Sequence, residues 1–255
     1  MLLSLITINF NNATGLQRTI NSVQLQETDF SFEHIIIDGA SVDNSLDVAE
    51  QYTGSYPNVV LISEKDSGIY NAMNKGLSVA SGSHVAFLNS GDTLEHSKVL
   101  SNICFEISSN ASIDFLYGDI SFEDNAGQIT RKWSAGHYVK SKLYFGWMPP
   151  HPMTTIRRAL LDENDNFNEN LLIAADYDLM LRVLLKRDIV VKYLSDTVVR
   201  MELGGVSNGS LRGILRSNLE VLKSWLNNKG YVIPYWIFFT KPLSKITQLQ
   251  RLKLK

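Results

Sequence analysis

Carboxylates and amides gather where four apolar runs of the chain end. Asn9 follows the first run, Asp38 ends the second, Asp66 follows the third, and Asn89 and Asp92 follow the fourth. A turn needs only Gly, Asn, Ser or Pro, so repeated carboxylates at such ends favour a binding site. Hard cations such as Mg²⁺ prefer oxygen ligands. The strand end FLNSGDT therefore predicts a cation site, although a plain turn is the simpler alternative.

The apolar runs are predicted to be buried strands, each followed by a helix. The expected strands span 2–10, 34–37, 59–63 and 85–88. The expected helices span 14–26, 43–52, 68–80 and 97–108, with Thr14 capping the first and Asp43 or Ser45 opening the second. This alternation predicts an α/β fold with a parallel sheet and right-handed crossovers. Because ligands bind at the carboxyl ends of parallel strands, we expect the polar ends to meet at one edge.

The second half of the chain is less regular. We expect strands at 115–120, 128–133 and 190–194, a rigid loop at 149–152, and helices at 174–186 and 210–226. Asp176 stands at the start of one of these helices, where a negative charge is favoured with or without a catalytic role.

The composition excludes several classes of protein. The chain has 255 residues, 44% of them hydrophobic, and a formal net charge of −2, so it offers no general electrostatic surface for nucleic acid. Its single cysteine, Cys104, excludes an internal disulfide and a thiolate metal cluster. The apolar N-terminal run is too short for a signal peptide or a membrane span, which predicts a cytoplasmic protein.

Five stretches occur together in a specific order. They are IIDGASVD at 36–43, SEKDSGIYNAMNKG at 63–76, ASG at 80–82, FLNSGD at 87–92 and ADYDLMLR at 175–182. On these residues the chain, over roughly 2–210, resembles the family 2 glycosyltransferases, in particular bacterial enzymes that build capsule, O-antigen or exopolysaccharide, including colanic acid. The resemblance implies the GT-A fold, a Rossmann-like, mostly parallel central sheet flanked by helices.

The resemblance also implies an activity. The protein would be an inverting glycosyltransferase that moves a sugar from a nucleotide diphosphosugar to a saccharide or polyprenyl-diphosphate-linked acceptor in surface polysaccharide biosynthesis. A Mg²⁺ or Mn²⁺ ion would offset the charge of the leaving diphosphate. Asp92 matches the last Asp of the family's metal motif, but Asn89 replaces the first Asp and Gly91 the middle residue. This departure predicts weak metal binding without donor.

Donor contacts follow from the same resemblance. Asp38 matches the residue that accepts a hydrogen bond from the nucleotide base, and a carboxylate suits the imide N–H of uracil, which favours UDP without excluding a guanine nucleotide. Thr7 and Asn9 would line the same pocket, and Asp66 would lie near the nucleotide and the sugar. Arg200 would assist the diphosphate. A turn-forming role for Asp38 stays open.

On the acceptor side, Asp176 matches the family's general base, which takes the proton of the attacking hydroxyl. His151, within the loop 149–152, matches a region near the acceptor where the family often has a histidine. A loop histidine bonded to backbone is an equal alternative.

The domain organisation is expected to be one large unit with an extension. Residues 1–210 would form the GT-A domain, with 1–110 as the nucleotide-sugar half and 111–210 as the acceptor half, and 211–255 would form a helical, aromatic and basic extension. The interleaved aromatic and basic residues of 223–255 are typical of peripheral contact with the inner face of the cytoplasmic membrane. A packed terminal helix or a homodimer contact explains them equally well.

Two other functions compete. The missing first Asp of the metal motif favours a catalytically inactive nucleotide-sugar-binding or scaffold protein of a polysaccharide assembly complex, whereas Asp92 and Asp176 argue against it. A nucleotidyltransferase would open with a Gly-rich, basic loop after its first strand, and this chain has the sequence NFNN there.

Overall fold

The computed structural model describes residues 1–124, 126–161, 166–186, 188–202, 211–228 and 249–251. Its strands are β1 (Leu3–Asn9), β2 (Phe32–Asp38), β3 (Val59–Ser63), β4 (His84–Phe87), β5 (Thr93–Leu94), β6 (Phe115–Glu123), β7 (Ile129–Trp133), β8 (Thr155–Arg157), β9 (Val191–Glu202) and β10 (Leu249–Arg251). Its α-helices are α1 (Ala13–Gln24), α2 (Ser45–Ser55), α3 (Ile69–Val79), α4 (Val99–Ser109), α5 (Ala175–Leu185) and α6 (Leu211–Asn227), with 3₁₀ turns η1 (Lys140–Phe145) and η2 (Arg158–Leu160).

One sheet joins the strands of the described ranges. Its order is β10-β7-β6-β8-β4-β1-β2-β3, with β9 beside β6 and β5 beside β9. β4, β1, β2 and β3 run parallel, and β9 runs parallel to β6. β8 lies between β4 and β6 and is antiparallel to both. The predicted α/β class with a mostly parallel central sheet is confirmed, and antiparallel strands extend it in the second half.

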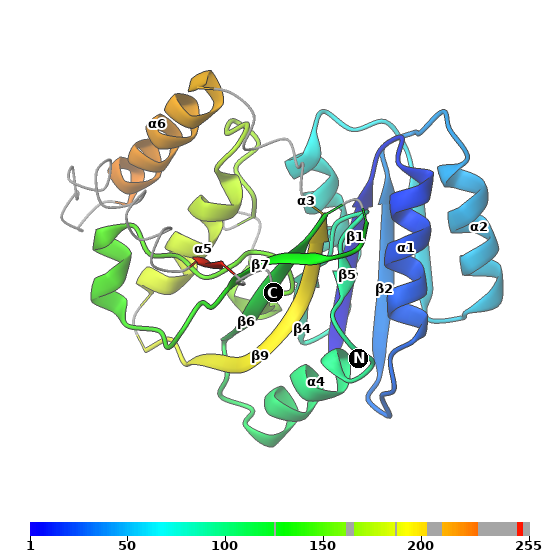
Figure 1. The fold of residues 1–255 in the computed structure, drawn as a ribbon, viewed down its shortest axis with the longest axis horizontal. Coiled ribbons are helices and arrows are strands. Elements are labelled where there is room, and N and C mark those ends of the chain that lie inside the picture. The colour runs from blue at the N-terminus through cyan, green and yellow to red at the C-terminus, as the bar shows by residue number, and fades with distance from the viewer. Residues whose placement is uncertain (125, 162–165, 187, 203–210, 229–248, 252–255) are drawn as a thin grey trace.

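Helices cover both faces of this sheet (Figure 1). On one face, α1 and α2 bury apolar side chains against β2 and β3, and α4 packs beside them against β4 and β6. On the other face, α3 and α5 form a larger core with α6. Gly76 brings α3 close to β1, because a Cβ at this position would lie 2.5 Å from Cγ2 of Ile6.

Some local predictions need correction. Asn12, and not Thr14, caps α1, since its side chain accepts a hydrogen bond from the backbone N–H of Gly15. The strand expected at 190–194 continues to Glu202 because its second half pairs with β5 and β6. The sequence did not indicate β5 or β8, since two or three residues carry no periodicity.

In the C-terminal extension, α6 packs onto α5, whereas β10 is a strand that pairs with β7, so the extension is not helical throughout. The Trp225 side chain is 1% exposed, and its Nε1 donates to the hydroxyl of Tyr177 at 3.0 Å. Trp225 therefore faces the interior, which favours the packed-helix alternative for this residue. The other aromatic residues of 223–255 lie outside the described residues. No helix in the described ranges is both long and apolar enough to cross a membrane.

Candidate active site

The carboxyl ends of β1, β2 and β3 meet at one edge of the sheet. Asn9 is the register partner of Asp38, and Asp38 is that of Ser63. Asp66 reaches the turn after β2, because its Oδ2 lies 2.5 Å from the position that a Cβ on Gly39 would take. Its Oδ1 accepts from the N–H of Gly68 at 3.0 Å. The structure thus brings these predicted donor residues together.

Asp38 is fully buried, and each of its oxygens accepts two hydrogen bonds. Oδ1 accepts from Asn9 Nδ2 at 2.9 Å and from Ser41 Oγ at 2.5 Å. Oδ2 accepts from Ser41 N at 2.9 Å and from Ser63 Oγ at 2.8 Å. Burial acts to raise the pKa of Asp38, but the hydrogen bonds outweigh it and hold the pKa below its ordinary value. Asp38 therefore organises the turn as a carboxylate, and its contact with a base stays a prediction.

The same network leaves one acceptor unused. Asn9 donates its amide to Asp38, while its own Oδ1 is buried without a hydrogen-bond partner. A buried acceptor without a donor costs free energy, so a ligand N–H placed there would be bound favourably. The sequence pointed to Asn9 but could not single out this atom.

Thr7 lies apart from these polar ends. Its hydroxyl donates to the carbonyl of Leu88 at 2.8 Å, so it accepts from His34 Nε2 at 2.9 Å. Nδ1 of that ring then accepts from the Tyr52 hydroxyl at 3.2 Å. Burial lowers the pKa of His34 to about 3, which keeps the ring neutral. The Thr7 side chain is thus part of the core under α2.

The turn after β4 is fixed against α1. Gly91 has a φ of 101°, a conformation that favours glycine. Its N–H donates to Thr19 Oγ1 at 3.0 Å, and that hydroxyl donates to the carbonyl of Asp92 at 2.7 Å. The N–H of Ser90 also donates to Ile8 O at 3.1 Å. These hydrogen bonds fix the backbone of the turn against α1 and β1.

Asp92 is 8% exposed, and no hydrogen bond to its carboxylate is found among the described residues. Burial raises the pKa of Asp92 to about 7, although the Arg18 guanidinium opposes this rise and Glu202 adds to it. Oδ1 of Asn89 is likewise buried without a partner. Two such oxygens on one turn fit a hard divalent cation, whose binding would displace the proton. The described residues contain no cluster of three His, Cys, Asp or Glu side chains able to hold a metal.

Arg18 was missed by the sequence analysis. It stands on α1 and forms ion pairs with Glu123 of β6 and, at 3.2 Å, with Glu202 of β9. Its charge acts on Asp92 from this position. A single arginine in an amphipathic helix reads as a solvent-facing residue, so only the long-range contacts show that it faces the site.

Arg200 is engaged by glutamates. Its Nη2 lies 2.9 Å from Glu95 Oε1, and its Nη1 lies 3.7 Å from Glu123 Oε2. The strand pairing puts it opposite Thr93, directly after Asp92. The predicted contact of Arg200 with a diphosphate stays a prediction, and it would have to form beside these ion pairs.

Asp176 lies in the first turn of α5, where its Oδ1 accepts from the N–H of Tyr177 at 2.8 Å. Its charge reaches two neighbours. Burial lowers the pKa of His151, and Asp176 partly opposes that shift, so the ring is neutral. Burial and, to a lesser degree, Asp176 raise the pKa of Tyr70. The charge of Asp176 therefore acts on His151 and Tyr70, and the acceptor-side roles of His151 and Asp176 stay predictions.

Aromatic rings hold His151 in place. Its ring stacks on Phe87 with centroids 5.7 Å apart, and it meets Phe167 edge-on at 6.0 Å. Phe87 is the last residue of β4, two positions before Asn89. The ring of His151 therefore lies directly beside the residue from which the turn after β4 begins. Nε2 of His151 is buried without a hydrogen-bond partner, which excludes a backbone hydrogen bond at that atom.

Glu220 of α6 fixes the residues just before α5. Its carboxylate accepts from the backbone N–H groups of Leu172, Ile173 and Ala174 at 3.1, 2.9 and 3.0 Å. Burial acts to raise the pKa of Glu220, but these hydrogen bonds outweigh it and hold the pKa below its ordinary value. The described part of the expected extension thus contributes to the position of Asp176. The domain boundary at 210 stays a prediction.

Comparison with known proteins gives a family. Residues 4–163 match the family model described as Glycosyl transferase family 2. An uncharacterized glycosyltransferase of Mycobacterium tuberculosis is 33% identical over 191 residues, which are 71% of this chain and 68% of that protein. A PGL/p-HBAD biosynthesis glycosyltransferase of Mycobacterium bovis is 28% identical over 207 residues, 80% of this chain and 78% of that protein. The matched range of the family model includes Asp92 and His151 and ends before Asp176.

Solved structures share the fold. S. aureus TarS 1-349 in complex with UDP-GlcNAc superposes with a TM-score of 0.70 at 21% identity, covering 96% of this chain and 73% of that chain. The mannosyltransferase PcManGT from Pyrobaculum calidifontis, in complex with GDP-Man and Mn²⁺, has a TM-score of 0.64 at 13% identity, covering 94% of this chain and 68% of that one. These likenesses confirm the predicted GT-A fold.

Proposed function

Because the chain belongs to Glycosyl transferase family 2 and is therefore a glycosyltransferase, we propose that it moves a sugar with inversion from a UDP-sugar to a saccharide or lipid-linked saccharide of surface polysaccharide biosynthesis. The complexes of TarS with UDP-GlcNAc and of PcManGT with GDP-Man support a nucleotide-sugar donor. The observation that carries the proposal is the buried carboxylate of Asp92, which lies beside the unpartnered Oδ1 of Asn89.

Asp92 and Asn89 would hold a Mg²⁺ or Mn²⁺ ion together with the donor diphosphate. When bound, the ion supplies positive charge that stabilises the departing nucleotide diphosphate. Asp92 must lose its proton to bind the ion, and the neighbouring Arg18 favours that ionisation. A neutral amide in place of a second carboxylate lowers the charge of the site, so we expect tight metal binding only with donor present.

The donor nucleotide would lie over the carboxyl ends of β1 to β3. Asn9 Oδ1 is the acceptor that is free to take a base N–H, while Asp38 keeps the turn in place. Asp66 would border the sugar. The hydrogen bonds of Asp38 fix the turn, and Oδ1 of Asn9 is left for the ligand. Together they support a pocket whose shape is set before the nucleotide binds.

Asp176 would take the proton of the acceptor hydroxyl as that oxygen attacks the anomeric carbon and the diphosphate leaves. Its place at the start of α5 is maintained by Glu220, which holds the residues before the helix. His151, neutral beside it, would offer a ring nitrogen to the acceptor without adding charge.

The test is turnover of UDP-, GDP- and dTDP-sugars with Mn²⁺, measured as nucleotide release, in the wild type and in matched Asp→Asn variants. We expect Asp176→Asn to lower kcat by about 10²–10⁴-fold with donor binding retained, as for a lost general base. Asp92→Asn should abolish metal-dependent donor binding. Asp47→Asn, which changes an exposed acid on α2, should behave as wild type.

Two results would contradict the proposal. Failure of the wild type to bind any nucleotide sugar would overturn the donor assignment. Donor binding without turnover, unchanged in both site variants, would instead identify an inactive sugar-binding or scaffold protein.

A further inference from the structure

Asn74 of α3 forms a paired contact with the backbone of Phe167, a residue that lies 93 positions later in the chain. Its Oδ1 accepts from the N–H of Phe167 at 2.9 Å, and its Nδ2 donates to the carbonyl of Phe167 at 3.0 Å. The same Nδ2 donates to Oε1 of Glu169 at 2.8 Å, and Asn71 donates to Oε2 of that carboxylate at 3.1 Å. Because an amide side chain carries a donor and an acceptor on neighbouring atoms, this pairing depends on the residue type at position 74.

The segment 166–174, which carries Phe167, lies outside the helices and strands of the structure. Side chains of other elements take the place of a backbone ladder there. Glu220 bonds the last residues of the segment, and Asn74 pairs with both backbone polar groups of Phe167. The position of Phe167 therefore depends on α3.

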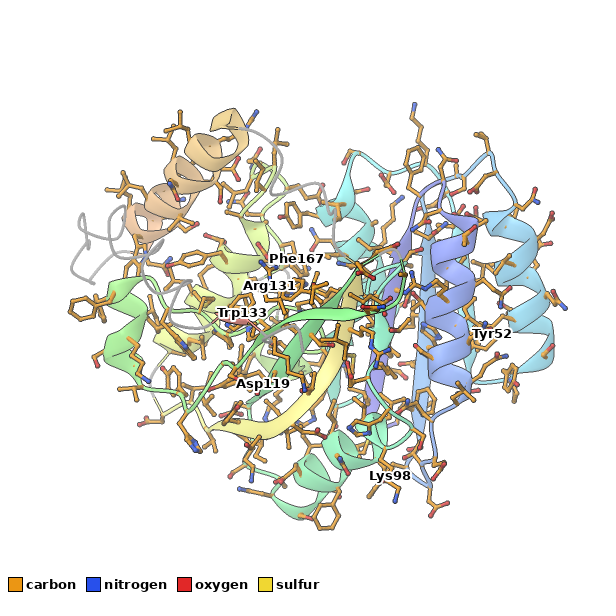
Figure 2. The ribbon with its side chains drawn as sticks, viewed as in Figure 1. Tyr52, Lys98, Asp119, Arg131, Trp133 and Phe167 are labelled. Atoms are coloured by element: carbon orange, nitrogen blue, oxygen red, sulfur yellow. The ribbon has the colours of Figure 1, made fainter. Side chains whose placement is uncertain are left out.

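The ring of Phe167 touches three other rings. It belongs to the core that α3 and α5 share (Figure 2), and it stacks on Tyr70 with centroids 5.8 Å apart. It meets Phe87 edge-on at 5.1 Å and His151 edge-on at 6.0 Å. His151 therefore contacts one ring that β4 holds in place and a second ring whose backbone is held by Asn74.

The Phe167 ring is also linked to the start of α5. Tyr70 precedes Asn74 by about one turn of α3, so both side chains leave the helix on the side that faces Phe167. Burial raises the pKa of Tyr70, the charge of Asp176 adds to this rise, and backbone hydrogen bonds from the first two residues of α5 oppose it. Phe167 therefore contacts both His151 and the tyrosine that borders Asp176.

The next residue on α3 faces the donor side instead. Lys75 Nζ donates to the carbonyl of Lys65 at 2.8 Å and lies 2.9 Å from Oε1 of Glu64. These residues directly precede Asp66. Successive side chains of a helix point roughly 100° apart, so α3 holds the donor loop with one residue and the Phe167 segment with its neighbour. A substitution of Asn74 can therefore separate the two contacts.

We propose that Asn74 is a positioning residue of the sugar transfer, which acts by holding Phe167 against His151. The contact keeps the imidazole in one orientation beside the turn after β4 and leaves its Nε2 to bond the attacking oxygen. This inference rests on the proposed glycosyl transfer and deepens it, because it assigns α3 a role on the acceptor side. Loss of the pairing should slow transfer without weakening the binding of the donor.

The first measurement is steady-state nucleotide release with Mn²⁺ and water as the acceptor, using whichever UDP-, GDP- or dTDP-sugar the wild type turns over fastest. We expect Asn74→Ala to lower kcat by about 10- to 100-fold, because small misplacements of reacting groups have effects of this size. KM for the nucleotide sugar should change by less than about twofold, since the donor contacts of α3 are intact. Asn102→Ala removes an exposed amide of α4, bonded to Asp196 at 3.3 Å, and should behave as wild type.

The second measurement reports on His151 without activity. Its ring protons lie in the ring current of Phe167, so the ¹H–¹³C signal of the imidazole, assigned with His151→Gln, is sensitive to that contact. Phe167→Leu removes the ring and sets the size of the shift for a complete loss. We expect Asn74→Ala to shift the signal in the same direction. The signal of His34, which packs on Tyr52 in a separate core, should not move.

Three outcomes would overturn the inference. An Asn74→Ala protein that is less stable but keeps the wild-type kcat would show that the pairing serves folding only. A raised KM for the nucleotide sugar would assign Asn74 to the donor side. A lower kcat with an unchanged His151 signal would show that Asn74 does not act through this ring.

Two further controls keep these results separable. Asn74→Asp retains the acceptor for the N–H of Phe167 but loses the donor to its carbonyl, and it replaces Asn74→Ala if that protein does not fold. Failure of the proposed function has a different signature, because the wild type itself would then release no nucleotide from any of the donors.

Discussion

Asp38 and Asp92 are buried carboxylates at the ends of two strands of one sheet, and their surroundings are opposite. Asp38 accepts four hydrogen bonds, and its pKa lies below the ordinary value. The carboxylate of Asp92 has no hydrogen bond among the described residues, and its pKa is raised to about 7. The turn after β2 is thus complete in itself, whereas the turn after β4 is fixed in its backbone and incomplete in its side chains.

This difference separates residues that build the site from those that act in it. A fully bonded carboxylate stabilises the folded protein, because its unfolded form is bonded only to water. A buried carboxylate without partners costs stability and is retained where a ligand supplies what is missing. The orphaned oxygens of Asn9 and Asn89 belong to the second class, although each sits beside residues of the first.

The largest effect is expected when the same substitution is made at Asp38 and at Asp92. Asp38→Asn should lower the free energy of unfolding by about 3 kcal/mol. The new amide N–H groups would face N–H and O–H donors that now bond to a carboxylate oxygen of Asp38. Asp92→Asn should leave the metal-free protein as stable as wild type or more stable, because it removes a buried charge. Urea unfolding at pH 8 measures both. Equal losses at the two positions would remove the distinction.

A third buried carboxylate sharpens the comparison. Glu220→Gln should lower the free energy of unfolding by roughly 2 kcal/mol and reduce kcat, because the N–H groups before α5 lose a charged acceptor. The pKa of Glu220 is lowered on folding, so its contribution is present above the unfolded value of about 4.5 and is lost as pH falls through the folded pKa.

Urea unfolding and nucleotide release measure these two effects. Glu50→Gln, at an exposed site on α2, is the matched control. A Glu220→Gln protein that loses stability but keeps full kcat would show that α6 supports the fold without positioning Asp176.

A further test is a difference in pH dependence. The folded pKa of Asp92 is raised, so between about pH 4 and 7 the folded state holds a proton that the unfolded state has lost, and stability falls as pH rises. We expect wild type to lose on the order of 1 kcal/mol per pH unit relative to Asp92→Asn across this window, measured without metal. Parallel stability curves for the two proteins would mean that Asp92 is not desolvated.

Much of the fold could be predicted because its signals are local. Residues 35–37 are all isoleucine, as suits a strand buried on both faces, and they lie in β2. The polar residues that end β1, β2 and β4 could be expected at one edge for the same reason. β5 and β8 could not be predicted, since each exists only through pairing with a distant strand.

The site could be predicted by residue type but not by atom. Asp92 was identified from its place after β4. That its carboxylate has no hydrogen bond could not be predicted, because this depends on which distant residues pack around it. Thr7 reads as a pocket residue from its position, and only the buried His34 shows where its hydroxyl points. Arg18 and Glu220 gave no local signal, because their partners are far away in sequence.

The pairing of β5 with β9 also sets an order in time. Thr93 is opposite Arg200, so more than 100 residues separate the two partners. A ribosome that has made the first 92 residues has supplied every group that bonds Asp38. Arg200 and Glu202, which enclose the region behind Asp92, are joined to the chain much later. The turn after β2 can therefore be finished during synthesis, while the surroundings of the turn after β4 must wait until most of the protein exists.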